Sequence, residues 1–452
     1  MPHNKRGLFG SKFGIIAATV GSAVGLGNIW RFPYVAGENG GGAFLIVYLF
    51  FVLAIGIPVL FAELIVGRSA HSNAVGSFKK LAPGKSWHLV GAMGVIASFM
   101  ILSYYLVIAG WTLEYLYQSI ANNLAGKSTI ELKGMFDSFV GTPSRTLMWF
   151  FVFMLMNVFI ISAGVEKGIE RFSKFLMPLL VLLLIVIGIR SVTLEGGQKG
   201  LEFLFKPDFS KVTTDVVLEA LGQAFFSLSI GMGAIITYGS YIRKKDNLGS
   251  TAFTVAIADT LIAVLAGVAI FPAVFAFGID PAEGTNLIFT TVPNVFQKMA
   301  GGYIFSILFF LLIAVAALTS TLSLFEVITS YLIEEFKMNR KTASIITATA
   351  IVITGSIATL SSNHVLNLKI FNLSIFNFLD YVTANIMLPL GGLLIVIFVG
   401  WIFKKDKVLK EIRHSKHYKA QYIPTLMFII KFIAPVAITI IFVNKMLGGG
   451  GH

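Results

Sequence analysis

The stretch Gly21-Ser22-Ala23-Val24-Gly25-Leu26-Gly27-Asn28 interrupts the first long hydrophobic segment of the chain. It places glycines, a serine and an asparagine where a membrane-spanning helix is ordinarily apolar. Non-helical backbone is tolerated at membrane depth only where it is buried in protein or lines a cavity. The stretch therefore predicts a broken membrane helix whose exposed backbone groups form part of a binding site.

The composition indicates a protein that crosses the membrane several times. Of the 452 residues, 56% are hydrophobic and 13% are charged, which excludes an ordinary soluble protein. The net charge of +13 does not indicate nucleic-acid binding, because the basic residues lie in short loops between apolar segments and act as topology signals. The absence of cysteine excludes disulfides and thiol chemistry. No cleavage site follows a short apolar core near the N-terminus, so we expect a retained first helix.

Eleven segments are apolar and long enough to span a bilayer. They are predicted at 12–36, 41–66, 88–122, 144–163, 169–190, 215–241, 250–277, 301–334, 341–360, 376–403 and 424–444. Most Lys and Arg residues fall on one side of this arrangement if the N-terminus is cytoplasmic, and the odd number of spans then places the C-terminus outside. We therefore expect a multi-pass protein of the cell membrane, embedded in the lipid bilayer.

The sixth segment carries a second interruption, Ser227-Leu228-Ser229-Ile230-Gly231-Met232-Gly233. Its position predicts two five-helix repeats, 1–190 and 215–403, each beginning with a broken helix, and an additional helix at 424–444. Because five is odd, the second repeat must be inverted in the membrane. Paired interruptions of this kind are the best sequence indicator of a transporter's central site. The predicted fold class is an all-α polytopic membrane protein with an inverted five-helix repeat.

The two interruptions offer groups that bind ions. Half-helix N-termini present free N–H groups that suit a carboxylate, and unwound carbonyls suit a hard cation. Asn28 and Ser227 add side-chain oxygens beside the breaks. Thr319 and Ser320 place adjacent hydroxyls in the eighth segment. Such hydroxyls commonly bond back to their own helix, but beside two broken helices we favour cation ligation.

Acidic residues within the hydrophobic segments are few, so each is a candidate functional residue. Glu63 is expected to accept hydrogen bonds from unwound backbone, and Asp259 is expected to lie beside a cation. The alternative for both is a neutral, protonated acid in a helix interface. Glu114 and Lys431 are instead expected to pair with other groups or to extend toward the membrane surface.

Two motifs resemble the signatures of a known family. Gly21–Tyr34 (GSAVGLGNIWRFPY), followed by Glu38–Phe44 (ENGGGAF), resembles the first-helix signature of the neurotransmitter:sodium symporter family. Gly222–Ser229 (GQAFFSLS) resembles its sixth-helix signature. The resemblance covers spans one to ten and is to the bacterial hydrophobic amino-acid transporter branch. It implies the fold of the bacterial leucine transporter and sodium-driven symport of L-amino acids by alternating access, and no enzymatic activity.

The resemblance also implies two sodium sites and a substrate pocket. The first sodium site would use Ala23, Asn28, Ser227, a group of the seventh helix for which we assign Asp259, and the substrate carboxylate. The second would use Gly21, Val24, Ala316, Thr319 and Ser320. The substrate pocket would be lined by Ser22, Ala23, Leu26, Gly27, Ile101, Tyr105, Phe226, Ser227, Ser229, Met232, Ser320 and Leu324.

Three positions bear on the choice of substrate and ions. Gly25 stands where monoamine carriers of the family have an aspartate, which favours an α-amino acid whose own carboxylate completes the first sodium site. Asp259 would supply the negative charge that animal members take from chloride, so we expect transport without chloride. The side-chain end of the implied pocket is apolar and includes the flexible Met232, which predicts an aliphatic or aromatic substrate.

The resemblance further implies gates on both sides of the site. Arg31 matches the outer-gate arginine, and Asp380 is expected to replace its usual acidic partner. The inner gate would be formed by Arg6, Tyr241 and Glu334. Gly168 and Pro178 match a Gly-x9-Pro pattern of the fifth helix, where the family is thought to unwind and hydrate the second sodium ion.

Four other classes of function are alternatives. The sequence has no continuous filter motif of an ion channel, no soluble signalling domain of a sensor, and no nucleophile–base pair or metal cluster of an enzyme. A proton-coupled carrier of the same fold is the strongest rival. Thr319 and Ser320 favour sodium, because proton-coupled relatives often have a cationic group at that place.

Overall fold

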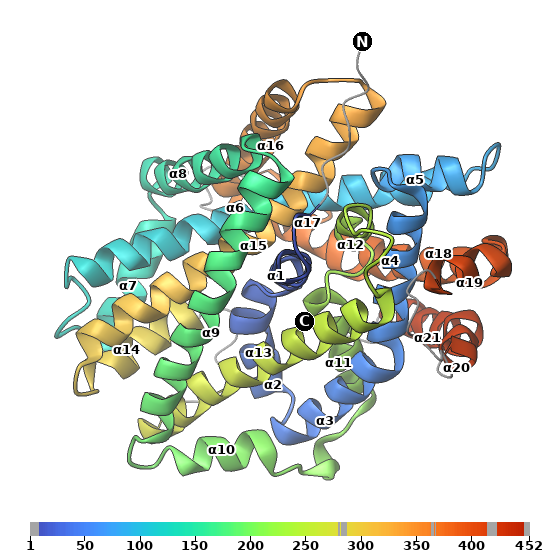
Figure 1. Ribbon diagram of the computed structural model, residues 1–452. Coiled ribbons are helices and arrows are strands. Elements are labelled where there is room, and N and C mark those ends of the chain that lie inside the picture. The colour runs from blue at the N-terminus through green and yellow to red at the C-terminus, as the bar shows by residue number, and fades with distance from the viewer. Residues whose placement is uncertain are drawn as a thin grey trace.

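The computed structural model describes residues 9–278, 281, 287–362, 366, 368–413 and 423–446. These residues form a bundle of helices (Figure 1), which confirms the predicted all-helical, multi-span class. Among the features that the sequence did not predict is a short antiparallel hairpin of β1 (Lys369–Ile370) and β2 (Leu373–Ser374).

The first half of the chain begins with a broken helix and continues with longer ones. Its helices are α1 (Lys12–Ala23), α2 (Phe32–Glu38), α3 (Gly42–Phe51), α4 (Ile57–Ala70), α5 (Ala74–Leu81), α6 (His88–Ile120), α7 (Thr129–Val140), α8 (Pro143–Ser162), α9 (Arg171–Val192) and α10 (Gln198–Phe205). Three π-helical segments precede α2, α4 and α9, namely Gly27–Arg31, Val52–Gly56 and Val165–Glu170, and a single 3-10 turn lies at Phe209–Lys211.

The second half begins in the same way, with two short helices. Its helices are α11 (Thr214–Ser227), α12 (Ala234–Gly239), α13 (Leu248–Ala276), α14 (Val292–Gln297), α15 (Gly302–Glu335), α16 (Arg340–Ser362), α17 (Ile375–Val382), α18 (Leu388–Ile397), α19 (Lys405–Arg413), α20 (Ile423–Phe428) and α21 (Ala434–Met446). Further π-helical segments lie at Leu287–Thr291, Thr383–Met387, Phe398–Ile402 and Ile429–Ile433.

Nine of the described helical stretches are long and apolar enough to cross a membrane without a break. α1 and the stretch Gly27–Glu38 form a tenth span, bent by 51°. α11 and α12 are separated by residues 228–233, and neither alone reaches across a hydrocarbon core of about 30 Å at about 1.5 Å per residue. Counted as one broken span, they complete the eleven segments that the sequence predicts.

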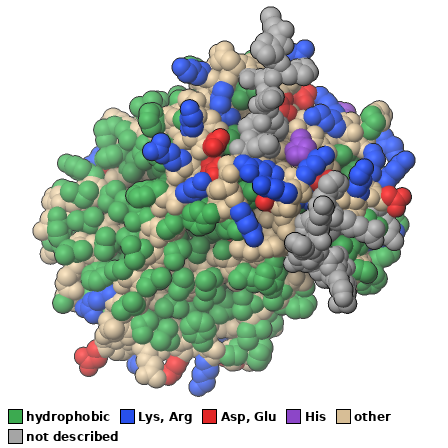
Figure 2. Space-filling view, in the orientation of Figure 1, with side chains coloured by type: hydrophobic (Ala, Val, Ile, Leu, Met, Phe, Trp, Pro, Cys, Tyr) green, Lys and Arg blue, Asp and Glu red, His purple; other side chains and the backbone are tan. Residues whose placement is uncertain are grey.

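The surface of the bundle is apolar over a broad area (Figure 2). Hydrophobic side chains cover the left and lower part of this view, whereas Lys and Arg gather toward its upper part. Large side chains on the outer helices, including Leu155, Phe159 and Phe175, are more than half exposed, at 67%, 73% and 67%. An exposed apolar surface of this kind suits contact with lipid.

The centre of the bundle is formed by α1, α12 and α15, which contact one another (Figure 1). α15 is buried on all sides over Leu312–Ser330, as is typical of a core helix. This buried stretch nevertheless contains the hydroxyls of Thr319, Ser320 and Ser323. The fold therefore places polar groups of α15 beside the breaks that follow α1 and α11.

Candidate ion and substrate site

The first break lies between α1 and the π-helical segment Gly27–Arg31. α1 ends because Val24 has an extended backbone, with φ −72° and ψ 119°. A Cβ atom on Gly25 would lie 2.0 Å from Ser320 Oγ and 2.8 Å from the Tyr105 hydroxyl. The same Tyr105 hydroxyl accepts the Leu26 N–H at 2.8 Å. Gly25 is therefore required here because two hydroxyls occupy the space that a side chain would need.

The second break joins α11 to α12 through a strongly curved backbone. Ser229, Gly231 and Gly233 all have positive φ, at 55°, 85° and 75°, and such angles favour glycine. At Gly231 a Cβ atom would also lie 2.3 Å from the backbone oxygen of Leu388. Gly231 is therefore favoured at this turn both by its positive φ and because α18 leaves no room for a side chain.

Neighbouring helices satisfy the unwound backbone of the second break. Glu63 Oε1 accepts the Gly231 N–H at 2.7 Å, as the sequence predicts for this acid. Ser98 Oγ donates to Met232 O at 2.6 Å. Ser229 Oγ donates to Ser22 O at 2.9 Å, which joins the second break directly to the first.

A first polar cluster consists of Asn28, Ser227 and Asp259, all fully buried. Asn28 Nδ2 lies 3.0 Å from Ser227 Oγ and 2.8 Å from Asp259 Oδ1, and Ser227 Oγ donates to Asp259 Oδ2 at 2.5 Å. Ala23 ends α1 close by and lines the adjoining cavity. The structure thus brings the protein groups assigned to the first sodium site into one region. Amide, hydroxyl, carbonyl and carboxylate oxygens are the ligands that hard cations prefer.

A second polar cluster joins α15 to the end of α1. The hydroxyl oxygens of Thr319 and Ser320 each lie 3.2 Å from Val24 O, and Thr319 Oγ1 also lies 2.9 Å from Ala316 O. Gly21 is adjacent, since a Cβ atom there would lie 3.5 Å from Thr319 Cβ. One hydroxyl proton cannot serve two carbonyls at once. The cluster therefore brings two hydroxyl oxygens and two carbonyl oxygens together, and neutral oxygens of these kinds are ligands that a hard cation binds.

These clusters differ from the sites of transition metals. Within the described ranges, no group of three or more His, Cys, Asp or Glu side chains is placed to hold a metal ion. Asp259 is the one acid of the two clusters, and their remaining ligands are neutral oxygens. A singly charged hard cation suits such a ligand set better than zinc or iron does.

A cavity of about 340 Å³ adjoins both clusters. Its lining residues are Ser22, Ala23, Gly27, Ile101, Tyr105, Phe226, Ser229, Met232, Ser320, Ser323 and Leu324. Of the twelve predicted pocket residues, Leu26 and Ser227 are not part of this wall: Leu26 turns its N–H to Tyr105 and Ser227 turns its hydroxyl to Asp259. Ser323 was missed by sequence reasoning, although its spacing of three from Ser320 places it on the same helix face.

The cavity wall combines polar groups with apolar side chains. Ser22 Oγ is buried without a hydrogen-bond partner, so it is available to a polar group in the cavity. Ile101, Met232 and Leu324 supply apolar surface, and each is at most 5% exposed. The arrangement suits a small molecule that is charged at one end and apolar at the other.

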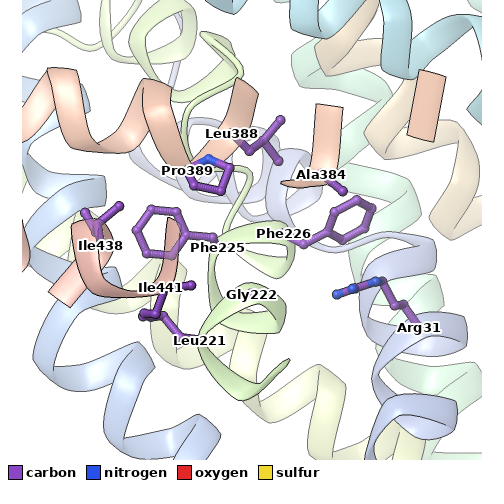
Figure 3. Close-up of a pocket in the computed structure, with 10 residues that line it drawn as sticks. All are labelled: Arg31, Leu221, Gly222, Phe225, Phe226, Ala384, Leu388, Pro389, Ile438 and Ile441. Carbon is purple, nitrogen blue, oxygen red and sulfur yellow. The ribbon is translucent and has the colours of Figure 1, made fainter. Parts of the chain in front are cut away.

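A second cavity, of about 440 Å³, lies beyond Phe226 (Figure 3). Phe226 lines both cavities, so its ring separates them. The guanidinium carbon of Arg31 lies 5.1 Å from the centre of this ring, within cation–π distance. The rest of the wall is mostly apolar and includes Phe225, Pro389 and Ile438. Phe226 and Arg31 thus close the central cavity on this side.

Arg31 has more partners than the sequence predicts. Its Nη1 donates to Gln223 Oε1 at 2.6 Å, and its Nη2 lies 3.8 Å from Glu219. Asp380, the expected partner, also lies close enough to interact electrostatically with Arg31. Gln223 and Glu219 were missed because their proximity depends on how α11 packs against the first break. The structure thus places the candidate outer-gate arginine against α11 with Asp380 nearby.

At the opposite end of the bundle, Tyr241 contacts an acid that sequence reasoning did not select. Its hydroxyl donates to Glu326 Oε1 at 2.6 Å, and Glu326 forms a buried ion pair with Arg340. Glu334 accepts hydrogen bonds from Ser72 Oγ and Asn73 N, both at 2.8 Å. The predicted gate residue Arg6 lies outside the described residues.

Glu114 and Lys431 have the kinds of partner that the sequence predicts. Glu114 forms an ion pair with Arg145 at 2.6 Å and accepts the Trp149 indole N–H at 2.5 Å. Lys431 Nζ lies 4.2 Å from the centre of the Trp401 ring. Both charged side chains therefore have partners that lie outside the central site.

Comparison with solved structures finds a close match. MhsT, solved in complex with L-phenylalanine, is 46% identical to this chain and has a TM-score of 0.90. The match covers 97% of this chain and 99% of the MhsT chain. It establishes the fold of the bacterial leucine transporter type that the motifs imply.

Comparison with known sequences gives the same family. An uncharacterized sodium-dependent transporter, YhdH of Bacillus subtilis, is 39% identical over 98% of both chains. An uncharacterized sodium-dependent transporter of Haemophilus influenzae is 38% identical over 98% of this chain and 99% of its own. The model of the sodium:neurotransmitter symporter family matches residues 6–134 and 129–448. The chain therefore belongs to the sodium:neurotransmitter symporter family and is a multi-pass, sodium-dependent transporter, not an enzyme.

Proposed function

We propose that the protein is a symporter that carries hydrophobic L-amino acids, aliphatic or aromatic, together with two sodium ions and without chloride. The observation that carries this proposal is the central cavity, which adjoins two oxygen-rich clusters and has apolar side chains in its wall. L-Phenylalanine in the related MhsT structure supports the substrate class. We place the protein in the cell membrane with its N-terminus cytoplasmic and its C-terminus outside, and divide it into repeats 1–190 and 215–403 with an additional helix at 424–444.

The ends of the substrate would be recognised by different parts of the wall. The carboxylate would lie at the first break, beside Gly27 and the Asn28 amide, where it would also complete the first sodium site. Ser22 Oγ offers a further polar partner because it is buried without one. The side chain would lie against Ile101, Met232 and Leu324, which are apolar and buried.

Asp259 would make the first sodium site independent of chloride. Its carboxylate lies in the same cluster as Asn28 and Ser227, and all three residues are fully buried. A fixed negative charge offsets the charge of a bound cation in a region where water does not screen it. No anion is then required to balance the site.

Transport would proceed by alternating access to the central cavity. On one side Phe226 and Arg31 would have to separate before substrate enters. On the other side the contacts around Tyr241, Glu326 and Arg340 would have to open before substrate leaves. Sodium couples to this cycle because its two clusters join groups of different helices, so that a bound ion favours the state in which those helices are together.

Uptake into proteoliposomes tests this proposal. We expect radiolabelled phenylalanine and leucine to accumulate with a sodium gradient, and not when potassium replaces sodium. Replacement of chloride by gluconate should leave uptake unchanged. A charged amino acid that competes better than phenylalanine and leucine would contradict the assigned substrate class, and sodium current without any amino acid would indicate a channel.

A matched pair of threonine variants tests the second sodium site. Thr319 and Thr321 both bond to a carbonyl of their own helix, at 2.9 and 3.0 Å, but Thr319 also reaches Val24 O. T319A should raise the sodium concentration for half-maximal uptake about tenfold, which is about 1.4 kcal/mol. T321A is the control and should leave this value unchanged. Equal effects of the two variants would contradict a sodium ligand at Thr319.

The rival function, proton-coupled transport, is tested in the same vesicles. A pH gradient imposed without sodium would drive uptake by a proton-coupled carrier. We expect no accumulation under this condition, because the second cluster contains neutral hydroxyls and carbonyls rather than a basic side chain.

A further inference from the structure

The N-terminal end of α1 is bound by a buried carboxylate of the neighbouring helix. Glu170 is 1% exposed and ends the π-helical segment that leads into α9. Its Oε2 accepts the Gly10 N–H at 2.6 Å, and its Oε1 accepts the Ser11 hydroxyl at 3.0 Å. Ser11 is itself the N-cap of α1, since its Oγ accepts the Gly14 N–H at 3.0 Å. One carboxylate therefore binds both the cap of α1 and the residue before it.

This contact is close because α1 has a glycine opposite the acid. A Cβ atom on Gly14 would lie 2.1 Å from Glu170 Oε1 and 2.4 Å from its carboxyl carbon. Any other residue at this position would displace the carboxylate. Lys174, one helical turn farther along α9, lies 2.6 Å from Glu170 Oε1 and balances its charge. The geometry thus depends on Gly14, Glu170 and Lys174 together.

The same N-terminal segment is attached separately to the region after α12. Arg243 Nη2 donates to Gly10 O at 2.7 Å, and the Phe9 N–H donates to Tyr241 O at 3.3 Å. Gly10 is therefore held on two sides, by Glu170 through its N–H and by Arg243 through its carbonyl. Loss of the Glu170 contact would remove the hydrogen bonds that hold the N-terminal end of α1 to this carboxylate, while Gly10 and Phe9 stay attached to the segment after α12.

The segment that carries Glu170 has an irregular backbone. Val165–Glu170 is π-helical and follows Gly164, whose φ of 99° few other residues adopt. A π-helical turn accommodates an extra residue, and isolated π turns are frequent at functional sites. One residue corresponds to a rotation of about 100° about a helix axis. A change of this segment between π- and α-helical winding would therefore turn Glu170 away from Gly10 and Ser11.

We propose that Glu170 is a positioning residue that holds the N-terminal end of α1 against α9, and that its release accompanies opening of the central cavity on that side. The inference rests on the proposed transport cycle. α1 runs from Ser11 to the break where Val24 meets the second polar cluster. Movement of the N-terminal end of α1 would therefore also disturb the oxygen groups at its other end, which links release of the Glu170 contact to release of the ion.

A cysteine reporter tests the contact directly. The natural chain has no cysteine, so A18C on α1 introduces a single thiol at a position that is 1% exposed. In sodium-free membranes, E170A and E170Q should each increase the rate of A18C alkylation by about tenfold, which corresponds to about 1.4 kcal/mol. E166Q changes an exposed acid of the same segment and is the control, with no expected change. Unchanged alkylation in E170A would overturn the proposal.

A double-mutant comparison separates this role from simple misfolding. G14A alone should increase A18C alkylation as E170A does, because the added methyl group displaces the carboxylate. In the E170A background the same G14A change should have no further effect, since the opposing side chain is gone. If the alkylation rate of the double mutant rises by the combined effects of G14A and E170A, the two changes act independently and the proposal is overturned.

Transport measurements distinguish this inference from the proposed function. We expect E170A to lower the rate of sodium-dependent phenylalanine uptake while phenylalanine binding to detergent-solubilised protein changes little. If the wild type transports no amino acid but E170A still exposes A18C, the proposed substrate is wrong and the Glu170 contact stands. If the wild type transports normally and E170A changes neither uptake nor alkylation, the contact has no role in the cycle.

Discussion

Gly25 is the residue at which the site leaves least room. Its Cα faces Ser320 Oγ and the Tyr105 hydroxyl, so that a methyl group would overlap both. G25A should therefore reduce the ratio kcat/KM for amino-acid uptake by about tenfold or more. Kinetics of radiolabelled uptake measure this effect. G134A is the control, because Gly134 is helical and exposed and no atom lies within 4 Å of an added Cβ.

The alternative outcome at Gly25 is also informative. Normal uptake by G25A would mean that Ser320 can move without loss of function, and its assigned place in the second sodium site would then be wrong. The sequence motif alone relates Gly25 to the absence of an acid. The structure adds a separate reason, which is that two hydroxyls already fill the space.

Asp259 carries the charge on which chloride independence depends. D259N keeps the shape of the side chain and removes the charge, so we expect weaker sodium binding and an uptake in gluconate that falls about tenfold. Added chloride should restore part of this loss. D137N, at an exposed position on α7, is the control. Uptake by D259N that is unchanged in both buffers would show that the charge is not needed.

Residue contacts were predictable where the family resemblance or a buried polar residue indicated them, and not where helix packing alone determines them. Five of the eleven cavity-lining residues lie in the two motifs, and five of the other six were expected from the family resemblance, Ser323 being the exception. Arg340 is the first residue of α16 and Glu326 lies within α15, and only helix packing determines which acid of α15 faces Tyr241. Gln223 lies within a motif, yet its contact with Arg31 depends on the docking of α11.

At the scale of elements, Gly231 tests how tightly the second break is packed. Gly231 and Gly278 both have positive φ, at 85° and 66°, but only Gly231 faces another backbone. G231A should lower the melting temperature in detergent, since backbone strain costs about 1–3 kcal/mol and the clash with Leu388 adds to it. G278A introduces backbone strain without the clash, so it should lower the melting temperature less. Equal shifts in melting temperature would mean that the α18 backbone moves to accommodate the added methyl group.

The breaks themselves could be predicted, whereas the π-helical segments could not. Glycine and polar residues within a hydrophobic segment are visible in the sequence, and they locate both interruptions. Gly168 of the Gly-x9-Pro pattern marks the segment Val165–Glu170 as a place of irregular backbone, but its π-helical winding arises from contacts such as the approach of Gly168 to Ile160 O. A single sequence contains no direct signal of such an approach.

For the whole molecule, the proposed coupling predicts that transport moves charge. A zwitterion with two sodium ions carries two net charges, and a potential of about 100 mV contributes roughly 2.3 kcal/mol per charge. A tenfold sodium gradient adds about 1.4 kcal/mol per ion, so that on the order of 7 kcal/mol is available. An inside-negative potassium diffusion potential should therefore increase accumulation of phenylalanine in proteoliposomes. Accumulation that does not respond to this potential would contradict two-sodium coupling.

The overall fold was the most predictable property of the chain. Hydrophobic segment length locates the spans, because a bilayer imposes one thickness on every helix that crosses it. The separation of the two breaks by five spans then indicates the repeat. Loop regions obey no such constraint, and the hairpin at Lys369–Ser374 could not be inferred from the pattern.

The two unwound segments have a consequence for how this carrier can evolve. Four of the nine residues assigned to the two sodium sites, Gly21, Ala23, Val24 and Ala316, have no polar side chain and can contribute only a peptide carbonyl, which no substitution removes. The apolar wall formed by Ile101, Met232 and Leu324 consists of side chains that single mutations replace. Selection can therefore exchange one substrate for another while the energy source is preserved. Descendants of such a carrier would keep sodium coupling while their substrate range changes.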